Sequence, residues 1–100
     1  MEVIMEIRVK SLKFDADQKL LDYVQKKVSK LERFDDQIVG FDVTLSLQER
    51  PENKVVKITV GVPGNDLIIE RNASSFEEAV NDAVDAMKEK IVRSKEKRYQ

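Results

Sequence analysis

The sequence predicts an α+β fold, a two-layer sandwich in which two helices pack on one face of a four-stranded mixed sheet in the order β-α-β-β-β-α. Three features predict it. Four segments alternate apolar and polar residues with a period of two, which is typical of half-buried strands. Two longer segments carry apolar residues at helical spacing. Because every strand has one polar side, one face of the sheet remains in water and both helices must cover the other face.

The N-terminal third contains the first strand and the first helix. The strand is expected where apolar residues recur at every second position, at Val3, Met5, Ile7 and Val9. Asp15 and Gln18 have the spacing of a capping box, so a helix is expected over about 16–33. Its apolar stripe consists of Leu20, Val24, Val28 and Leu31.

Three more strands follow, over 41–48, 56–62 and 67–71. Pro51 and the pair Pro63-Gly64 mark the turns between them, and the second turn is expected to be type II with Gly64 at positive φ. The connection through the first helix is long enough to join parallel strands, whereas the two short turns make antiparallel hairpins.

The last helix is expected from about 75 into the high 90s, because Ser74 and Ser75 each precede a glutamate by three positions in overlapping capping boxes. Its apolar stripe consists of Phe76, Ala79, Val80, Ala83, Val84, Met87 and Ile91. The capping role accounts for both serine hydroxyls, so neither is interpreted as a catalytic nucleophile.

Composition limits the function classes. The 100 residues make one domain, 1–100, with no histidine and no cysteine. The commonest general base and the thiol nucleophile are therefore missing. There is no glycine-rich phosphate loop, no metal-ligand spacing, no signal-peptide pattern and no apolar run long enough to span a bilayer. We expect a cytoplasmic protein with no enzyme activity, cofactor, metal, membrane partner or small-molecule substrate.

Charge is segregated along a chain whose net charge is only −1. Lys88–Arg98 carries six basic and two acidic residues, whereas Asp66–Asp85 carries six acids and one base. Such segregation produces a local positive field in a nearly neutral molecule. Ordinary solvated helix faces are the alternative explanation. Because both helices cover the same side of the sheet, their outer faces are expected to form one continuous basic surface.

This surface is the predicted RNA-binding site. Its residues are Lys26, Lys27, Lys30 and Arg33 in the first helix and Lys88, Lys90, Arg93, Lys95 and Lys97 in the second. On the second helix, Lys88 and Lys95 are expected on one side of the apolar stripe and Lys90, Arg93 and Lys97 on the other. The wet face of the sheet lacks the paired aromatic residues that stack on unpaired bases, so contacts are expected mainly with phosphates.

Several segments resemble the short ribosome hibernation promoting factors, a family that includes ribosome-associated inhibitor A and the ribosomal subunit interface proteins. Residues 24–32 are similar to the family's Val-x-x-Lys-x-x-Lys-Leu-Glu segment. Further similar segments are Asp36–Ile38, Val60–Gly64, Phe76–Asp85 and the tail Arg93–Lys97. The resemblance covers nearly the whole chain, and the family has the same order of strands and helices.

The resemblance implies a translation regulator that binds the small ribosomal subunit in the mRNA and tRNA channel and silences ribosomes in starved or stationary cells. By position, Lys27 and Lys30 match the family's first-helix lysines, and Arg93, Lys95 and Lys97 match those of the second helix. Ala86 and Glu89 stand where the family usually has basic residues, and Lys88 and Lys90 flank Glu89.

The alternative function is a small protein–protein interaction module with an open sheet edge and no nucleic-acid role. The sequence leaves open whether ribosomes are paired into dimers, whether a second hibernation factor takes part, which signal induces the protein and what its oligomeric state is.

Overall fold

The computed structural model describes residues 6–49 and 51–98. The elements are β1 (Glu6–Ser11), α1 (Gln18–Ser29), the 3-10 helix η1 (Lys30–Phe34), β2 (Gly40–Leu47), β3 (Lys54–Val62), β4 (Asn65–Ala73) and α2 (Phe76–Arg98). The order β-α-β-β-β-α and the α+β fold are confirmed. Val3 and Met5, expected in the first strand, lie outside the described residues.

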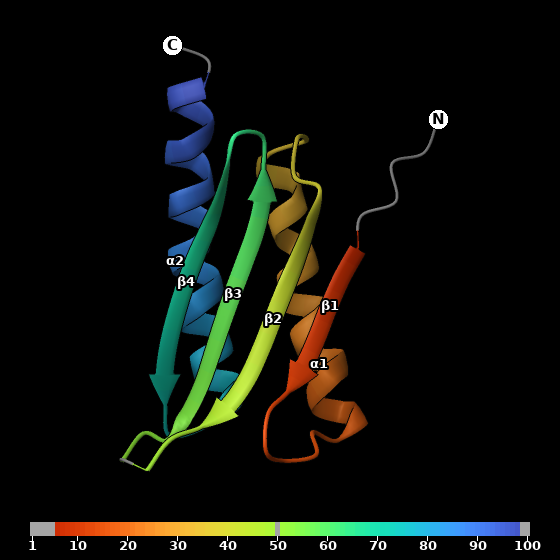
Figure 1. Cartoon of the computed structure of the whole chain (residues 1–100), viewed down its shortest axis with the longest axis vertical. Helices are drawn as coiled ribbons and strands as arrows, with labels where there is room; N and C mark the ends of the chain where they lie inside the picture. Colours follow the sequence, from red (N-terminus) through yellow and green to blue (C-terminus); the bar gives the residue numbers. More distant parts are fainter. Residues whose placement is uncertain (1–5, 50, 99–100) are drawn as a thin grey trace.

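The four strands form one sheet in the order β1-β2-β3-β4. β1 and β2 are parallel, and the β2–β3 and β3–β4 pairs are antiparallel hairpins. Both helices lie on the same face of this sheet, and the other face is uncovered (Figure 1). Gly64 has φ of 83°, as expected for the glycine of a type II turn.

The core lies between the sheet and the helices. The inward positions of β2 and β3 alternate with exposed or half-exposed ones, as a period of two requires. Small residues at Ala79 and Ala83 are fully buried and allow α2 to approach the sheet closely. The fully buried members from the helices are Val24 and Val28 in α1 and Ala79, Val80, Ala83, Met87 and Ile91 in α2.

The start of α1 differs from the predicted one. Asp17 is the N-cap, and its carboxylate accepts a hydrogen bond of 2.8 Å from the amide of Leu20. Asp15 is not the cap, and the Gln18 side chain bonds Asp22 instead of closing a capping box. The helix is also shorter than expected, because its last turn tightens into η1.

The start of α2 is closer to the prediction. The Ser75 hydroxyl accepts a hydrogen bond of 3.2 Å from the amide of Glu78, which is one of the two bonds of the predicted capping box. The Ser74 hydroxyl bonds the Glu78 carboxylate, so the expected pair of Ser74 with Glu77 is not formed. Glu77 and Glu78 lie in the first turn of α2, where they favour the helix dipole.

The two helices run in the same direction, so their C-terminal halves lie at one end of the molecule (Figure 1). The β3–β4 hairpin turn lies at this same end. This topology brings the basic parts of both helices together with the turn at Pro63-Gly64. Within residues 6–49 and 51–98, no helix is long and apolar enough to cross a membrane.

Candidate nucleic-acid interface

The basic residues of the first helix differ in how far their side chains are exposed. Lys26, Lys30 and Arg33 are exposed, whereas Lys27 is half-buried. The Lys27 ammonium lies 5.6 Å from the centre of the Tyr23 ring. The Tyr23 hydroxyl in turn donates a hydrogen bond of 3.0 Å to the side-chain oxygen of Asn81 in α2. Lys27 is therefore held beside the seam where α1 meets α2.

The same seam holds a base from α2. The Lys88 ammonium lies 5.1 Å from the centre of the Phe34 ring in η1. Cation–π contacts of this kind contribute about 0.5–1 kcal/mol at exposed sites. An ammonium has three donors, and those that do not face the ring can bond a ligand. Lys95, seven residues after Lys88, lies on the same side of α2. We call Lys27, Lys30, Lys88 and Lys95 the seam lysines.

A second group of bases lies on the other side of α2, next to β4. Here Lys90, Arg93 and Lys97 line a hollow of about 510 Å³ between α2 and the β3–β4 hairpin. The remaining lining residues are Pro63, Gly64, Asn65, Leu67 and Ser94. We call this hollow the hairpin groove. Among the described residues that line it, three are cations and none is acidic, so the groove fits an anion.

Lys90 is held within the hairpin groove. Its ammonium donates a hydrogen bond of 2.9 Å to the main-chain carbonyl of Ile68 at the edge of the sheet. Two of its hydrogens remain free for a ligand, since an ammonium has three donors. Arg93 and Lys97 are exposed and can reach the same ligand. The groove is thus suited to phosphate oxygens, which accept several charge-assisted hydrogen bonds at once.

The expected single basic surface is interrupted on α2. Asp85, Glu89 and Glu96 are exposed, and their spacing places them on the side of α2 opposite the buried Met87 and Ile91. This acidic ridge separates the seam lysines from the hairpin groove. The structure therefore brings Lys90, Arg93 and Lys97 together, places Lys88 and Lys95 elsewhere, and shows two basic surfaces in place of one.

Several residues of these surfaces were not predicted from sequence. The rings of Tyr23 and Phe34 contact two of the seam lysines, and Asn65 and Ser94 help to line the hairpin groove. The Pro63-Gly64 turn was recognised, but its place beside α2 depends on the direction of both helices. In the described part of the chain, no group of three or more His, Cys, Asp or Glu side chains could hold a metal ion.

Comparison with known proteins gives consistent matches. The family model described as "Sigma 54 modulation protein / S30EA ribosomal protein" matches residues 7–99. A curated relative, the ribosome hibernation promoting factor of Azotobacter vinelandii, is 23% identical over 96 residues, which are 96% of this chain and 88% of the relative.

Two solved structures are also similar. The N-terminal domain of Protein Y from Thermus thermophilus is 26% identical with a TM-score of 0.72, and the match covers 93% of this chain and 98% of that one. A ribosomal subunit interface protein from Coxiella burnetii has a TM-score of 0.79 at 18% identity, covering 91% of this chain and 98% of that one. The second match concerns the fold alone.

Proposed function

The chain belongs to the sigma 54 modulation protein / S30EA ribosomal protein family, and we propose that it is a translation regulator that binds the small ribosomal subunit. Binding would occupy the mRNA and tRNA channel and inactivate ribosomes under stress or in stationary phase. The relative from Azotobacter vinelandii, which is named as a hibernation promoting factor, supports the regulatory role. The hairpin groove, with three cations and no acid, is the observation that carries the RNA contact.

The proposed mechanism is occlusion without chemistry. Lys90, Arg93 and Lys97 would neutralise phosphates at the hairpin groove, and the seam lysines would contact a second stretch of backbone. A domain with one core between two layers is rigid, so it can fill a channel and exclude other ligands. Phosphate contacts fix position and register, and they do not require a base sequence.

The salt dependence of binding tests this proposal. Four to six phosphate contacts predict a log–log slope of about −3 to −5 between affinity for purified small subunits and salt concentration. The variant Arg93→Gln/Lys97→Gln removes two cations from the hairpin groove and should make the slope shallower by about 1.4 to 1.8. Both side chains point away from the core, so thermal unfolding should be nearly unchanged.

A charge-matched control separates a local contact from a general loss of positive charge. Lys13→Gln/Arg71→Gln removes the same charge from exposed positions outside both basic surfaces. This control should bind as the unmodified protein does. Wild-type affinity that does not change with salt would reject RNA-phosphate binding and would favour the alternative of a protein–protein module.

A further inference from the structure

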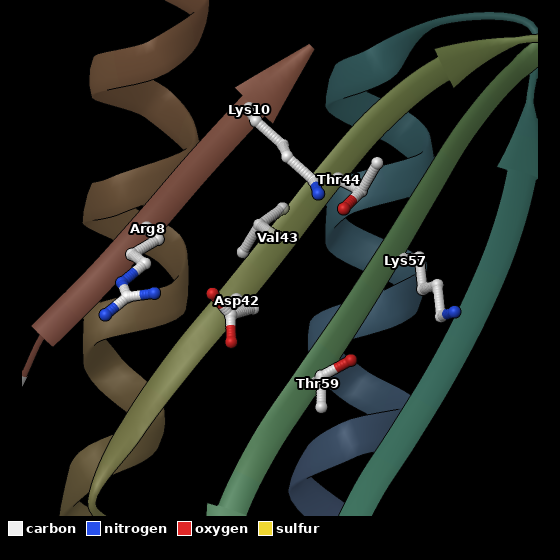
Figure 2. Close-up of a pocket in the computed structure, with 7 residues that line it drawn as sticks. All are labelled: Arg8, Lys10, Asp42, Val43, Thr44, Lys57 and Thr59. Atoms are coloured by element: carbon white, nitrogen blue, oxygen red, sulfur yellow. The ribbon is translucent and has the colours of Figure 1, made fainter. Parts of the chain in front are cut away.

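The open face of the sheet carries a second cluster of basic side chains, far from the helices. This cluster surrounds a hollow of about 520 Å³ lined by Arg8, Lys10, Asp42, Val43, Thr44, Lys57 and Thr59. Figure 2 shows these side chains on the three strands β1, β2 and β3. The helices pack against the opposite face of the sheet, so nothing in the described residues covers the hollow (Figure 1).

The strand register places two lysine residues on either side of Thr44. Lys10 is the partner of Thr44 across β1 and β2, and Thr44 is the partner of Lys57 across β2 and β3. Two strand spacings separate the backbones of Lys10 and Lys57, which is about 10 Å. The Lys10 side chain reaches over β2 toward Thr44 (Figure 2). The Lys57 side chain is directed toward β4 (Figure 2), so an anion above Thr44 would meet Lys10 directly and Lys57 after a change of its side-chain rotamer.

The neighbouring arginine is already neutralised. Arg8 donates two hydrogen bonds to the Glu6 carboxylate, at 2.9 Å from Nε and 3.2 Å from Nη2. The hydrogen bonding to Glu6 raises the pKa of the Arg8 guanidinium most, and the negative charges of Glu6 and Asp42 raise it further. The one positive charge of Arg8 thus faces two carboxylates, so only Lys10 and Lys57 can supply the attraction for an anion here.

Lys10 and Lys57 remain unpaired. Within residues 6–49 and 51–98, neither side chain forms a hydrogen bond or an ion pair, and the hydroxyls of Thr44 and Thr59 form no side-chain hydrogen bond. Glu70 is the partner of Lys57 across β3 and β4, but no ion pair joins them. The hollow therefore offers two free ammonium groups and two free hydroxyl donors.

We propose that this open sheet face is a second phosphate-binding surface, in which Lys10 and Lys57 bind the backbone of an RNA segment different from the one contacted by the helices. The inference rests on the proposed function, because it takes RNA as the anion. Charge complementarity supports it: two unpaired cations and two hydroxyl donors match phosphate oxygens. In residues 6–49 and 51–98, this face has no aromatic side chain to stack on a base, which favours the backbone as the ligand.

Contacts on both faces would place the domain between two RNA segments. The helix surfaces and the sheet hollow lie on opposite layers of the sandwich, so one segment could not contact both without wrapping around the domain. A rigid body held from two sides resists displacement better than one held from one side, since both contacts must break before it leaves.

The test uses paired substitutions on the sheet face. Lys10→Gln/Lys57→Gln should make the log–log salt slope of binding to small subunits shallower by about 1.4 to 1.8. Between about 50 and 200 mM salt, this slope difference means that the variant loses roughly seven- to twelvefold less affinity than the unmodified protein. The control Lys13→Gln/Arg71→Gln should keep the original slope. Glu70→Gln, which removes a negative charge beside Lys57, should tighten binding.

Each outcome decides a different point. If Arg93→Gln/Lys97→Gln weakens binding while Lys10→Gln/Lys57→Gln matches its control, the proposed function holds and the sheet surface is rejected. If the affinity of the unmodified protein does not change with salt, the proposed function and the sheet surface are both rejected.

Nuclear magnetic resonance gives a direct reading: signals of Lys10 and Lys57 should move on titration with a short RNA duplex. Movement only with an oligoglutamate peptide would assign the face to an acidic protein and overturn the inference.

Discussion

The acidic ridge on α2 makes Glu89 a sensitive position for RNA binding. Glu89 is exposed between the seam lysines and the hairpin groove, and its charge would be repelled by any phosphate held on either side. We predict that Glu89→Arg tightens binding to small subunits and that Glu89→Gln does so by about half as much.

The size of the effect follows from Coulomb's law. At about 7 Å in water, two unit charges interact with roughly 0.6 kcal/mol. Screening at physiological salt, with a Debye length of about 8 Å, reduces this to roughly 0.25 kcal/mol per unit charge. Glu89→Arg changes the charge by two units, so the expected gain is about 0.5 kcal/mol, or a two- to threefold lower Kd. Folding stability should change by only a few tenths of a kcal/mol.

An alternative role for Glu89 is to hold Arg93 by an ion pair at i+4. The structure does not support this role: within the described residues the ion pair present joins Arg8 to Glu6, and none joins Glu89 to Arg93. Dissociation constants at fixed salt decide the matter, with Glu49→Arg at the opposite end of the molecule as the control. If Glu89→Arg and Glu89→Gln both weaken binding, Glu89 organises the site and the repulsion argument is wrong.

Two further predictions concern the seam and the helix ends. Lys27→Glu/Lys30→Glu should weaken ribosome binding strongly while circular dichroism shows an intact fold. Val24→Asp should instead unfold the domain, because it buries an unpaired charge at a side chain that is 0% exposed. Tight binding by the lysine variant would remove the seam from the interface. Ser75→Ala should lower the free energy of unfolding, measured by urea denaturation, by about 0.5–2 kcal/mol, because the Glu78 amide loses its acceptor. An unchanged free energy of unfolding would show that water replaces the Ser75 hydroxyl as the acceptor.

The element order was predictable because it depends on local periodicity. Val24 and Val28 in α1, and Val43 and Leu45 in β2, were assigned to buried faces and are buried. Parallel pairing of β1 and β2 also followed, since a crossover helix separates the two strands. These features need only the spacing of apolar residues along the chain.

The start of α1 could not be predicted in the same way. Asp15 and Asp17 are both good capping residues, and the sequence alone favoured the one with a glutamine three positions later. In the structure, the Phe14 ring stacks on Phe76 with ring centres 5.1 Å apart, which fixes the β1–α1 loop against the start of α2. The helix begins after this contact, with Asp17 as the cap. Phe14 and Phe76 lie far apart in the sequence, so no local sequence pattern predicts their contact.

The candidate interface shows the same limit. Helical spacing alone places Lys88 and Lys95 on one side of the apolar stripe of α2 and Lys90, Arg93 and Lys97 on the other, but it does not show what lies beside each group. Lys90 bonds the carbonyl of Ile68 in β4, and Lys88 lies over Phe34 in η1. Both partners are set by tertiary packing, so the sequence predicted the two sides of α2 but not the contacts that hold Lys88 and Lys90.

The direction of the helices also decides which end of the molecule attracts RNA. The C-terminus of a helix carries roughly −0.5 of an elementary charge, so two parallel helices place about −1 at the end where the bases gather. Residues Lys88–Arg98 alone carry six basic and two acidic side chains, a surplus of four positive charges. The side chains of this part of α2 therefore outweigh the dipoles of both helices, whereas Asp17 and Glu77 lie at the helix starts. A nearly neutral chain thus becomes a polar molecule, and its field would orient the domain, basic end first, toward a polyanion before any contact forms.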